Sequence, residues 1–470
     1  MSDRLLLGRR VFLGSLGALG ALALPGHGWA ESGDDYKALV CVFLHGGNDA
    51  YNTVLATDSA SWKSYVHARR QDPDSIALDP AGLHELDALD ASGDRQFALN
   101  PGLPGLSRLF NDNRRLAIVA NVGPMRSSLN KAQYGQPEAP LPAKLFSHND
   151  QQSTWLSFGP EGTALGWGGL LADRIAQGNT NQLFTAISAI SSTVWLTGRQ
   201  VRPYQLSEQG SLRIGTQLDP KGVARVYGSD RVARILDELL STSTLPHVMA
   251  KDWCSMNRLA MDAQAILADK LPSASKAPFS KFNPSNPLSM QLQTVARMAS
   301  IQKELGIRRQ LFFVNLYGFD THDRQNQRHL RLMQQLDEAL CSFDSALGEL
   351  TLIDSVTTFT ASDFGRTFTS NGDGTDHGWG GHHFVMGGAV RGGRILGRFP
   401  VYAMKSRRDN EFPDSPDQLS NGVLLPSLST QGYARALGSW FGIADSELVA
   451  TLPDLDRLGA AGQLPGLFKA

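Results

Sequence analysis

Four short segments of strand length place the strongest limit on how this chain of 470 residues can fold. Three of them are almost continuously apolar, and the fourth is rich in β-branched and aromatic residues. They are Lys37–Leu44, Leu116–Val122, Leu311–Leu316 and Ser355–Thr360. Such runs are typical of strands that are covered on both faces, as in a parallel sheet between helices. The sequence therefore predicts a sheet with at least four buried strands.

Two helical patterns accompany the last two of these strands. Apolar residues recur at steps of three and four over Leu288–Leu305 and again over Met333–Leu350, which is the spacing of one helix face. The resulting order of helix, strand, helix and strand implies parallel pairing with right-handed crossovers. We therefore expect an α/β fold with a mostly parallel central sheet flanked by helices.

A more polar and mostly helical stretch separates the second and third strands. It runs from about residue 204 to 270 and is followed by a segment rich in proline and serine, Leu271–Pro287, which is typical of a linker. We interpret residues 204–287 as a helical cap inserted into one α/β domain that spans residues 31–470.

The first 30 residues have the features of an export signal. Arg9 and Arg10 precede an apolar run from Val11 to Leu24, and Gly28 and Ala30 stand at suitable positions before a cleavage site. The basic pair and the residues around it resemble the twin-arginine signal. The apolar run is shorter than the roughly 20 residues that a membrane-spanning helix needs. We therefore expect a periplasmic or secreted protein with no transmembrane segment in the mature chain.

The charge balance and the cysteines exclude several kinds of partner and site. The formal net charge is -1, from 44 basic and 45 acidic residues, so there is no general field to attract nucleic acid. Cys41, Cys254 and Cys341 lie far apart, which provides neither a disulfide framework nor a paired-cysteine metal clip. Any metal must therefore be held by oxygen and nitrogen atoms.

Acidic and imidazole side chains follow three of the four predicted strands, and more of them occur in a glycine-rich segment downstream. We expect metal ligands among Asp49, Asp320, His322, Asp363, Asp376 and His377, with His45, His148 and His382 as additional candidates. Ligands of parallel sheets bind beyond the carboxyl ends of the strands, where these loops converge. The mixture of carboxylates and imidazoles favours a divalent metal, with zinc or manganese preferred over magnesium or calcium.

Several of these residues also have a structural interpretation. Asp363 could cap the next turn, and Asp49 could end a glycine turn. Arg366 could form a structural ion pair instead of holding an anion. His382 and His383 are adjacent in an extended segment, so at most one of them should face the site. These alternatives stay open at the level of sequence.

The polar segment from Phe146 to Trp155 offers three hydroxyl groups for nucleophilic catalysis. They belong to Ser147, Ser153 and Thr154, and the sequence does not choose among them. In the same segment His148 and Asp150 could be further metal ligands or part of a polar helix start.

Several motifs in combination resemble the exported bacterial family called domain of unknown function 1501. Besides the twin-arginine start, they are Phe43–Asp49 (FLHGGND), Gly318–His322 (GFDTH), Asp363–Thr367 (DFGRT), Gly374–Gly378 (GTDHG), Gly387-Gly388 and Tyr433–Gly442 (YARALGSWFG). That family is in turn similar to the alkaline phosphatase and sulfatase superfamily. The resemblance implies an alkaline phosphatase-like fold in which the six metal-ligand candidates hold one or two metals and a phosphate or sulfate ester is attacked.

The chain departs from the superfamily pattern in two places. Asp363 is followed by Phe364, where the superfamily commonly has a histidine, which puts a second metal in doubt. None of the cysteines lies in a Cys-x-Pro-x-Arg sequence, which argues against a sulfatase with a matured cysteine. A serine esterase is disfavoured because the mature chain has no Gly-x-Ser-x-Gly turn.

Two hypotheses for the function follow. The favoured one is an exported, metal-dependent hydrolase of phosphate, sulfate or related esters, with a small-molecule ester or anion as substrate and Arg366 binding the anion. The alternative is a non-catalytic exported protein that binds metal or a partner on a hydrolase-like scaffold, because a fold does not settle a function.

Overall fold

The computed structural model describes residues 35–469 apart from several short gaps. The gaps are 71–72, 91–93, 191–192, 208–215, 219–223, 227, 241–246, 275–278 and 280. The predicted export signal lies outside the described residues. From Tyr36 onward the described residues belong to one compact unit, and all that follows concerns this unit.

The main sheet has nine strands and contains all four strands that the sequence predicts. Its order is β13-β5-β12-β11-β1-β10-β6-β7, and β14 pairs with β5. The predicted strands are β1 (Lys37–His45), β5 (Leu116–Gly123), β10 (Arg309–Tyr317) and β11 (Val356–Ser362). The others are β6 (Ala186–Ser188), β7 (Tyr204–Gln205), β12 (Gly381–Met386), β13 (Arg394–Leu396) and β14 (Leu428–Ser429).

The sheet is mostly parallel, as expected. The central strand β1 pairs in parallel with β10 on one side and with β11 on the other. Among the described strands of this sheet, β12 alone runs antiparallel to its neighbours, β11 and β5. The carboxyl ends of β1, β10 and β11 therefore lie at the same edge, where the register places His45 beside Tyr317.

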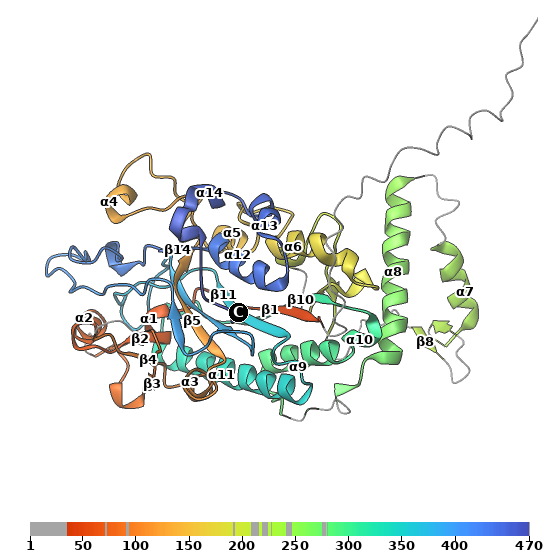
Figure 1. Ribbon diagram of the computed structural model, residues 1–470, viewed down its shortest axis with the longest axis horizontal. Helices are drawn as coiled ribbons and strands as arrows, with labels where there is room; N and C mark the ends of the chain where they lie inside the picture. The colour runs from red at the N-terminus through yellow and green to blue at the C-terminus, as the bar shows by residue number, and fades with distance from the viewer. Residues whose placement is uncertain are drawn as a thin grey trace, which may run out of the picture. The chain divides into compact units, whose positions relative to one another are not determined.

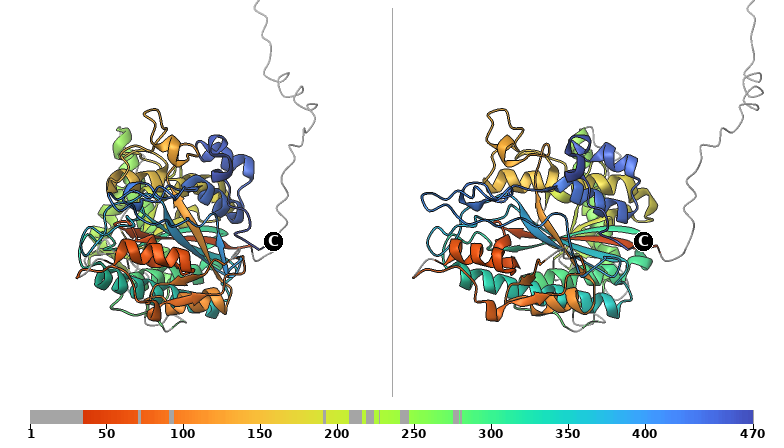
Figure 2. Two further views of the ribbon diagram at one scale, coloured as in Figure 1. Left: turned by 90° about the vertical axis from the view of Figure 1, so that its left-hand side faces the viewer. Right: turned by 60° about the vertical axis from the view of Figure 1, so that its left-hand side comes forward.

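Helices cover both faces of the sheet (Figures 1 and 2). One face carries α3 (Pro104–Asn111), α9 (Pro287–Ser300) and α11 (Gln325–Glu349), and the other carries α5 (His148–Ser157), α6 (Trp167–Ile175) and α12 (Thr430–Phe441). Successive side chains of a strand point to opposite faces. Accordingly, Val40 and Val42 of β1 belong to the apolar cluster on the face of α3, α9 and α11. Leu39 and Phe43 belong to the cluster on the face of α5, α6 and α12. This two-sided burial explains the continuous apolar runs.

Both predicted helices are present with different limits. The first is α9 followed by α10 (Gln302–Leu305), and Gly306 ends it with a φ of 64°, a conformation that glycine adopts without a steric penalty. The second is α11, which begins eight residues before the predicted start at Met333. Its first turns were missed because they are largely polar and lack the apolar spacing.

The interval 204–287 contains the helices α7 (Asp230–Leu239) and α8 (Val248–Lys270), as expected for its helical part. It also contains β7 and the pair β8 (Thr216–Leu218) and β9 (Ala224–Val226), which the sequence did not predict. Lys270 Nζ donates to Glu304 O at 2.9 Å, so the end of α8 contacts the chain before β10. The candidate site described below follows the carboxyl end of β10, whereas α8 contacts the chain before its amino end. The described residues of the interval therefore take no part in the site.

The remaining elements are short. They are α1 (Ala50–Thr53), β2 (Val54–Ala56), α2 (Ser59–Arg69), β3 (His84–Leu86), β4 (Phe97–Leu99), α4 (Lys131–Tyr134), α13 (Asp445–Thr451) and α14 (Leu455–Leu458). The strands β2, β4 and β3 form a small separate sheet. In the described part of the chain, no helix is long and apolar enough to cross a membrane.

Candidate metal centre

The loops that follow β1, β10 and β11 meet at one edge of the sheet. Phe319 N donates to His45 O at 3.0 Å, which joins the first two loops. Gly46 has a φ of +115°, and a Cβ atom there would lie 2.3 Å from Asp320 N. Only glycine permits both this backbone conformation and this close approach. Gly46 therefore lets the loop after β1 pack directly against Asp320.

Three histidines converge on Asp320 at this edge, and we call these four residues the three-histidine cluster. Ligand atoms of His148, Asp320 and His377 all lie within 4.8 Å of one another. The Nε2 atoms of His148 and His377 lie 3.6 Å and 3.4 Å from the Asp320 carboxylate. His322 Nε2 lies 3.0 Å from the same carboxylate and 2.9 Å from His377 Nε2. The four side chains are between 25% and 45% exposed, so the cluster lies at the surface, although the Nε2 atom of His148 is itself shielded from solvent.

The other ring nitrogen of each histidine faces an acceptor. His148 Nδ1 lies 2.7 Å from Asp363 Oδ2, and His377 Nδ1 lies 2.7 Å from the carbonyl oxygen of Phe146. A carbonyl oxygen only accepts hydrogen bonds, so His377 carries its proton on Nδ1 and presents an Nε2 lone pair to the cluster. This is the tautomer that metal-binding histidines commonly have when an outer group fixes the ring.

The third ring, that of His322, has a weaker contact of the same kind. Its Nδ1 atom lies 3.4 Å from Asp376 Oδ1. Asp376 is held in turn by Asn371, whose Nδ2 donates to Asp376 Oδ1 at 2.8 Å. All three imidazoles thus turn Nε2 toward Asp320 and Nδ1 toward an acceptor.

Charge and burial favour a cation within the cluster. Burial lowers the pKa of His377 and so favours its neutral form. Burial raises the pKa of Asp320, but the hydrogen bond and the positive charge of Arg366 outweigh this and lower the pKa overall. The Nε2 atoms of His322 and His377 lie 2.9 Å apart beside this carboxylate, and two facing nitrogen lone pairs repel each other unless a proton or a metal ion lies between them. Imidazole nitrogen and carboxylate oxygen together are a ligand set that zinc and other transition metals accept.

An unpartnered nitrogen supports this fit. His148 Nε2 is shielded from solvent and has no hydrogen-bond partner among the described residues. Such an atom costs free energy unless something binds to it. The hydrogen bond to Asp363 raises the pKa of His148, although burial opposes the shift. In the absence of metal a proton can therefore occupy this position.

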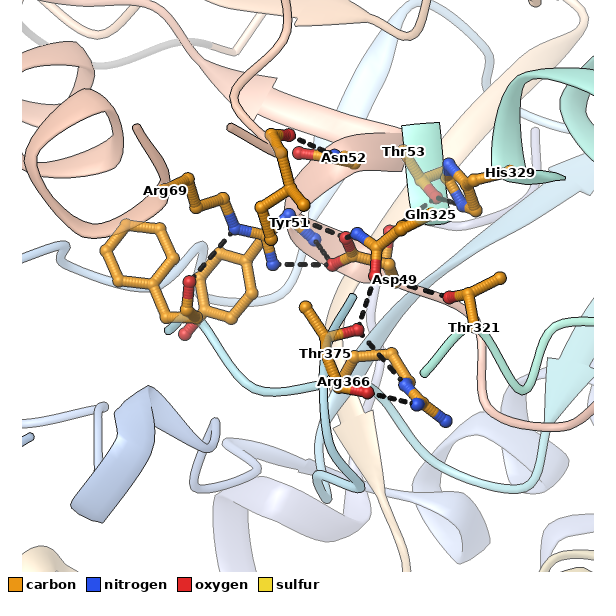
Figure 3. A network of polar contacts seen from close by, with 12 residues as sticks. Asp49, Tyr51, Asn52, Thr53, Arg69, Thr321, Gln325, His329, Arg366 and Thr375 are labelled. Atoms are coloured by element: carbon orange, nitrogen blue, oxygen red, sulfur yellow. Dashed lines mark hydrogen bonds and ion pairs between the residues drawn. The ribbon is translucent and has the colours of Figure 1, made fainter. Parts of the chain in front are cut away.

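Asp49, a predicted metal ligand, lies outside the cluster in a buried ion pair (Figure 3). Its two oxygens accept hydrogen bonds from Arg69 at 2.6 Å and 2.9 Å, from Gln325 at 2.5 Å and from Tyr51 N at 3.1 Å. Burial raises the pKa of Asp49, but the charge of Arg69 outweighs it and lowers the pKa overall. Asp49 also precedes α1 as its N-cap, a structural role different from the end of a glycine turn that the sequence left open.

A chain of hydrogen bonds leads from Asp49 to Asp320, and Figure 3 shows it as far as Arg366. Gln325 donates to Asp49 and accepts from Thr375 Oγ1 at 2.5 Å, and Thr375 Oγ1 accepts from Arg366 Nε at 3.2 Å. Arg366 Nη1 then donates to Asp320 at 2.7 Å. Arg366 is buried and also donates to Gly46 O and Thr375 O. Its described contacts are thus those of a structural ion pair that orients Asp320, and anion binding by Arg366 stays a prediction.

Asp363, another predicted ligand, contacts the cluster through His148. The carboxylate is buried, and Gln152 Nε2 donates to its Oδ2 atom at 2.8 Å. Because residues four apart share one face of a helix, His148 and Gln152 of α5 reach Asp363 together. That i, i+4 spacing was the one signal in the sequence that could have paired these two residues with a common partner.

The candidates His45 and His382 lie outside the cluster. His45 stacks on Tyr317 with 4.4 Å between ring centroids, and burial lowers its pKa. His382 is buried on β12, where its Nδ1 accepts from Asn121 N at 3.1 Å. The neighbouring His383 contacts Trp155 from the opposite face, which agrees with the expectation that the two adjacent histidines point in opposite directions.

The hydroxyl groups proposed as nucleophiles donate to groups outside the cluster. Ser147 donates to Asp150 Oδ2 at 2.9 Å, and Thr154 donates to Asp150 O at 2.8 Å. Ser153 donates to Pro160 O at 2.7 Å. These bonds stay within α5 and the loop that follows it, so the structure brings no one of the three hydroxyls into hydrogen-bond contact with the cluster.

The two buried histidines of β12 predict how stability depends on pH. Burial lowers the pKa of His382 and His383 to about 3, whereas an unfolded histidine has a pKa of about 6.5. The unfolded chain therefore binds more protons between these values, and the free energy of unfolding falls as the pH falls through this window. We expect His383→Phe to flatten that slope by up to about 1.4 kcal/mol per pH unit.

Urea unfolding at a series of pH values between 4 and 7 measures this slope. The matched control is His67→Phe, because His67 is an exposed histidine of α2. Equal slopes for His383→Phe and the wild type would contradict the prediction.

Comparison with known families supports one of the resemblances. A family model described as "Protein of unknown function (DUF1501)" matches residues 270–452. The matched range includes Asp320, His322, Arg366 and His377, whereas His148 precedes it. A search of curated proteins found no significant match. The match supports the DUF1501 family, and the likeness to alkaline phosphatases and the export signal remain predictions.

Proposed function

We propose that this chain, whose residues 270–452 match the DUF1501 family, is an exported metal-dependent hydrolase of phosphate, sulfate or related esters. One observation carries the proposal: three imidazoles turn their Nε2 atoms toward Asp320 while an acceptor faces each Nδ1 atom. Such a preformed set of donors around one carboxylate is what a transition-metal site requires.

The donor types favour zinc or manganese. Two imidazole nitrogens, from His148 and His377, and the carboxylate of Asp320 lie within reach of one ion, with His322 beside them. Such a set suits a borderline metal better than magnesium or calcium, which prefer oxygen. Asp363 would fix the ring of His148, the carbonyl of Phe146 would fix that of His377, and Arg366 would orient Asp320. The sites of catalytic metals keep a position open to substrate, and the partial exposure of the cluster is compatible with this.

Water is the nucleophile that we propose. A metal bound in the cluster would act as a Lewis acid and activate water for attack on the ester. Ser147, Ser153 and Thr154 donate to other groups, which disfavours a side-chain nucleophile from that segment. The loop after β11 provides Asp363, which keeps the proton of His148 on Nδ1 and leaves Nε2 free for the metal.

A non-catalytic, exported metal-binding protein is the second candidate. The same hydroxyl contacts favour it, because no side-chain nucleophile among the three candidates contacts the cluster. Both functions share the metal site and the proposed export by the twin-arginine route, and they differ only in turnover.

The test compares metal content with hydrolysis in the mature chain. Protein purified without chelator is assayed for bound metal, stripped, and reloaded with Zn²⁺, Mn²⁺ or Mg²⁺. Each form is then offered p-nitrophenyl phosphate, bis(p-nitrophenyl) phosphate and p-nitrophenyl sulfate. We expect one metal ion per chain and turnover of at least one ester with Zn²⁺ or Mn²⁺. Metal binding without turnover of any ester would favour the second candidate, and folded protein without metal affinity would overturn both.

A substitution at Asp363 separates an orienting role from direct ligation. Asp363→Asn keeps the shape of the side chain but removes the charge that fixes His148. We expect metal affinity to fall by about 10–100-fold, the usual effect of losing an outer partner of a metal ligand. Isothermal titration of the stripped protein measures this, with Asp445→Asn in an exposed ion pair as the control. A complete loss of binding would show that Asp363 is itself a ligand.

A further inference from the structure

A pocket of about 250 Å³ adjoins the three-histidine cluster. Nine residues line it, among them Tyr134, Phe146, Asp376, His377, Leu419, Ser420 and Val423. His377 belongs to both the pocket and the cluster, and Asp376 contacts His322 of the cluster. A molecule whose reacting group lies at the cluster can therefore extend into this pocket.

The chemistry of the lining selects the kind of group that fits. Four of the nine lining side chains are aromatic or aliphatic, and none is lysine or arginine. Leu419 and Val423 are buried in a small apolar cluster with Trp379, on which Tyr134 also packs. The apolar wall thus has a rigid backing. A volume of this size holds a substituted benzene ring, since benzene itself occupies an apolar cavity of about 150 Å³.

Charge in the pocket disfavours an anionic group. Asp376 is the acidic residue of the lining, and the described lining offers no fixed cation to offset it. A phosphate chain or a carboxylate in this position would face the carboxylate of Asp376 without a partner. An uncharged group makes no such unfavourable contact.

Phe146 links the pocket to the cluster. Its φ of +73° is unusual for a bulky residue, and such strain persists where the surrounding structure enforces it. The carbonyl oxygen of Phe146 accepts from His377 Nδ1, while its side chain lines the pocket. One residue therefore fixes a cluster histidine and also forms part of the apolar wall.

We propose that this pocket binds the alcohol portion of the ester, and that this portion is uncharged and aromatic or branched aliphatic. The inference rests on the proposed hydrolase function, which it deepens by naming the substrate class. During hydrolysis the bond between the phosphoryl or sulfuryl group and this alcohol breaks, water supplies the new oxygen, and the alcohol leaves with a proton.

The test uses benzyl and methyl esters of the same acid, because benzyl alcohol and methanol are leaving groups of similar acidity. We expect kcat/KM of the metal-loaded wild type to be at least 10-fold higher for the benzyl ester. Two variants fill the pocket: Val423→Phe at its buried wall and Ser420→Trp at its exposed rim. Each should lower kcat/KM for the benzyl ester about 10-fold or more, the scale of burying one aromatic ring. For the methyl ester, kcat/KM should change by less than about 2-fold, because this ester has no ring whose burial the variants could prevent.

A binding measurement distinguishes failure of this proposal from failure of the proposed function. NMR titration with benzyl alcohol reports on the pocket without turnover, and Val449→Phe on exposed α13 is the control. Binding to the wild type that both filled variants lose supports the pocket, even if no ester is hydrolysed and the hydrolase function fails. Hydrolysis with equal preference for both esters in all variants would overturn the pocket proposal and leave the hydrolase intact. Absence of both binding and hydrolysis would overturn both.

Discussion

Asp320→Asn is expected to lower the affinity of the proposed metal centre by more than about 100-fold, beyond the usual effect of losing an outer partner. Asp320 is the residue on which the three imidazoles converge, with its oxygens 3.0 Å to 3.6 Å from their Nε2 atoms. Asparagine keeps the shape but removes the negative charge, which is the main attraction for a divalent cation in a partly buried site. His377→Gln should have a similar effect, because it removes the Nε2 atom that contacts both Asp320 and His322.

Competition with a chromophoric chelator measures these affinities in the stripped and reloaded protein. Asp320→Asn also removes the ion pair with buried Arg366, so circular dichroism must show that the variant folds. His377→Gln leaves that ion pair in place and separates ligand loss from unfolding. The control is His67→Gln, at an exposed histidine of α2. Wild-type affinity in both cluster variants would refute the metal centre.

Arg69→Met should lower the free energy of unfolding by about 3–5 kcal/mol, the range observed when one partner of a buried ion pair is removed. Both side chains of the Arg69–Asp49 pair are fully buried. The variant leaves the Asp49 carboxylate without its charged partner, and the remaining donors, Gln325 and Tyr51 N, are neutral. Burial of that carboxylate would then raise its pKa and favour protonation.

Urea unfolding measures the loss, and two further variants define its cause. The double variant Asp49→Asn with Arg69→Met should recover part of the stability, because neither buried charge then remains unpaired. Arg435→Met removes a comparable pair with Asp445 at the surface and should cost less than about 1 kcal/mol. Equal effects of Arg69→Met and Arg435→Met would show that burial does not strengthen the internal pair.

The Asp49 network connects the three-histidine cluster to the buried interior of the protein. Gln325, Thr375 and Arg366 connect Asp49 to Asp320 through successive hydrogen bonds. Each of these residues has its donors or acceptors bound, which fixes its rotamer. Asp49, which we expected to be a metal ligand, therefore supports the orientation of Asp320.

Much of the fold could be predicted because local pattern and burial agree. The runs at β1, β5 and β10 are apolar on both faces, so helices must cover both faces of any sheet that contains them. The strand β11 is rich in β-branched residues and is likewise buried along its whole length. The antiparallel β12 escaped prediction because its sequence, GHHFVM, carries two histidines and follows several glycines. Those histidines are buried by contacts with Asn121, Trp155 and Phe399, which come from distant parts of the chain.

The sequence could indicate those residues of the candidate site that directly follow a strand or lie in the glycine-rich segment. Asp320 and His322 follow β10, and His377 lies in the glycine-rich segment before β12, as the sequence indicated. His148, in contrast, was only an additional candidate, because nothing in the chain around it shows that α5 begins beside Asp363. For the same reason the partner of Asp49, Arg69, could not be found from the strand that precedes Asp49.

The sequence by itself determined the mostly parallel α/β sheet, the edge at which its polar loops gather, and the types of polar side chain available there. Periodicity and the direction of parallel strands are local properties, and they suffice for these conclusions. Only the tertiary structure decided which of the polar residues face one another. A carboxylate becomes an ion-pair partner, as Asp49 does with Arg69, or the centre of a histidine cluster, as Asp320 does, according to groups that approach it from elsewhere in the chain.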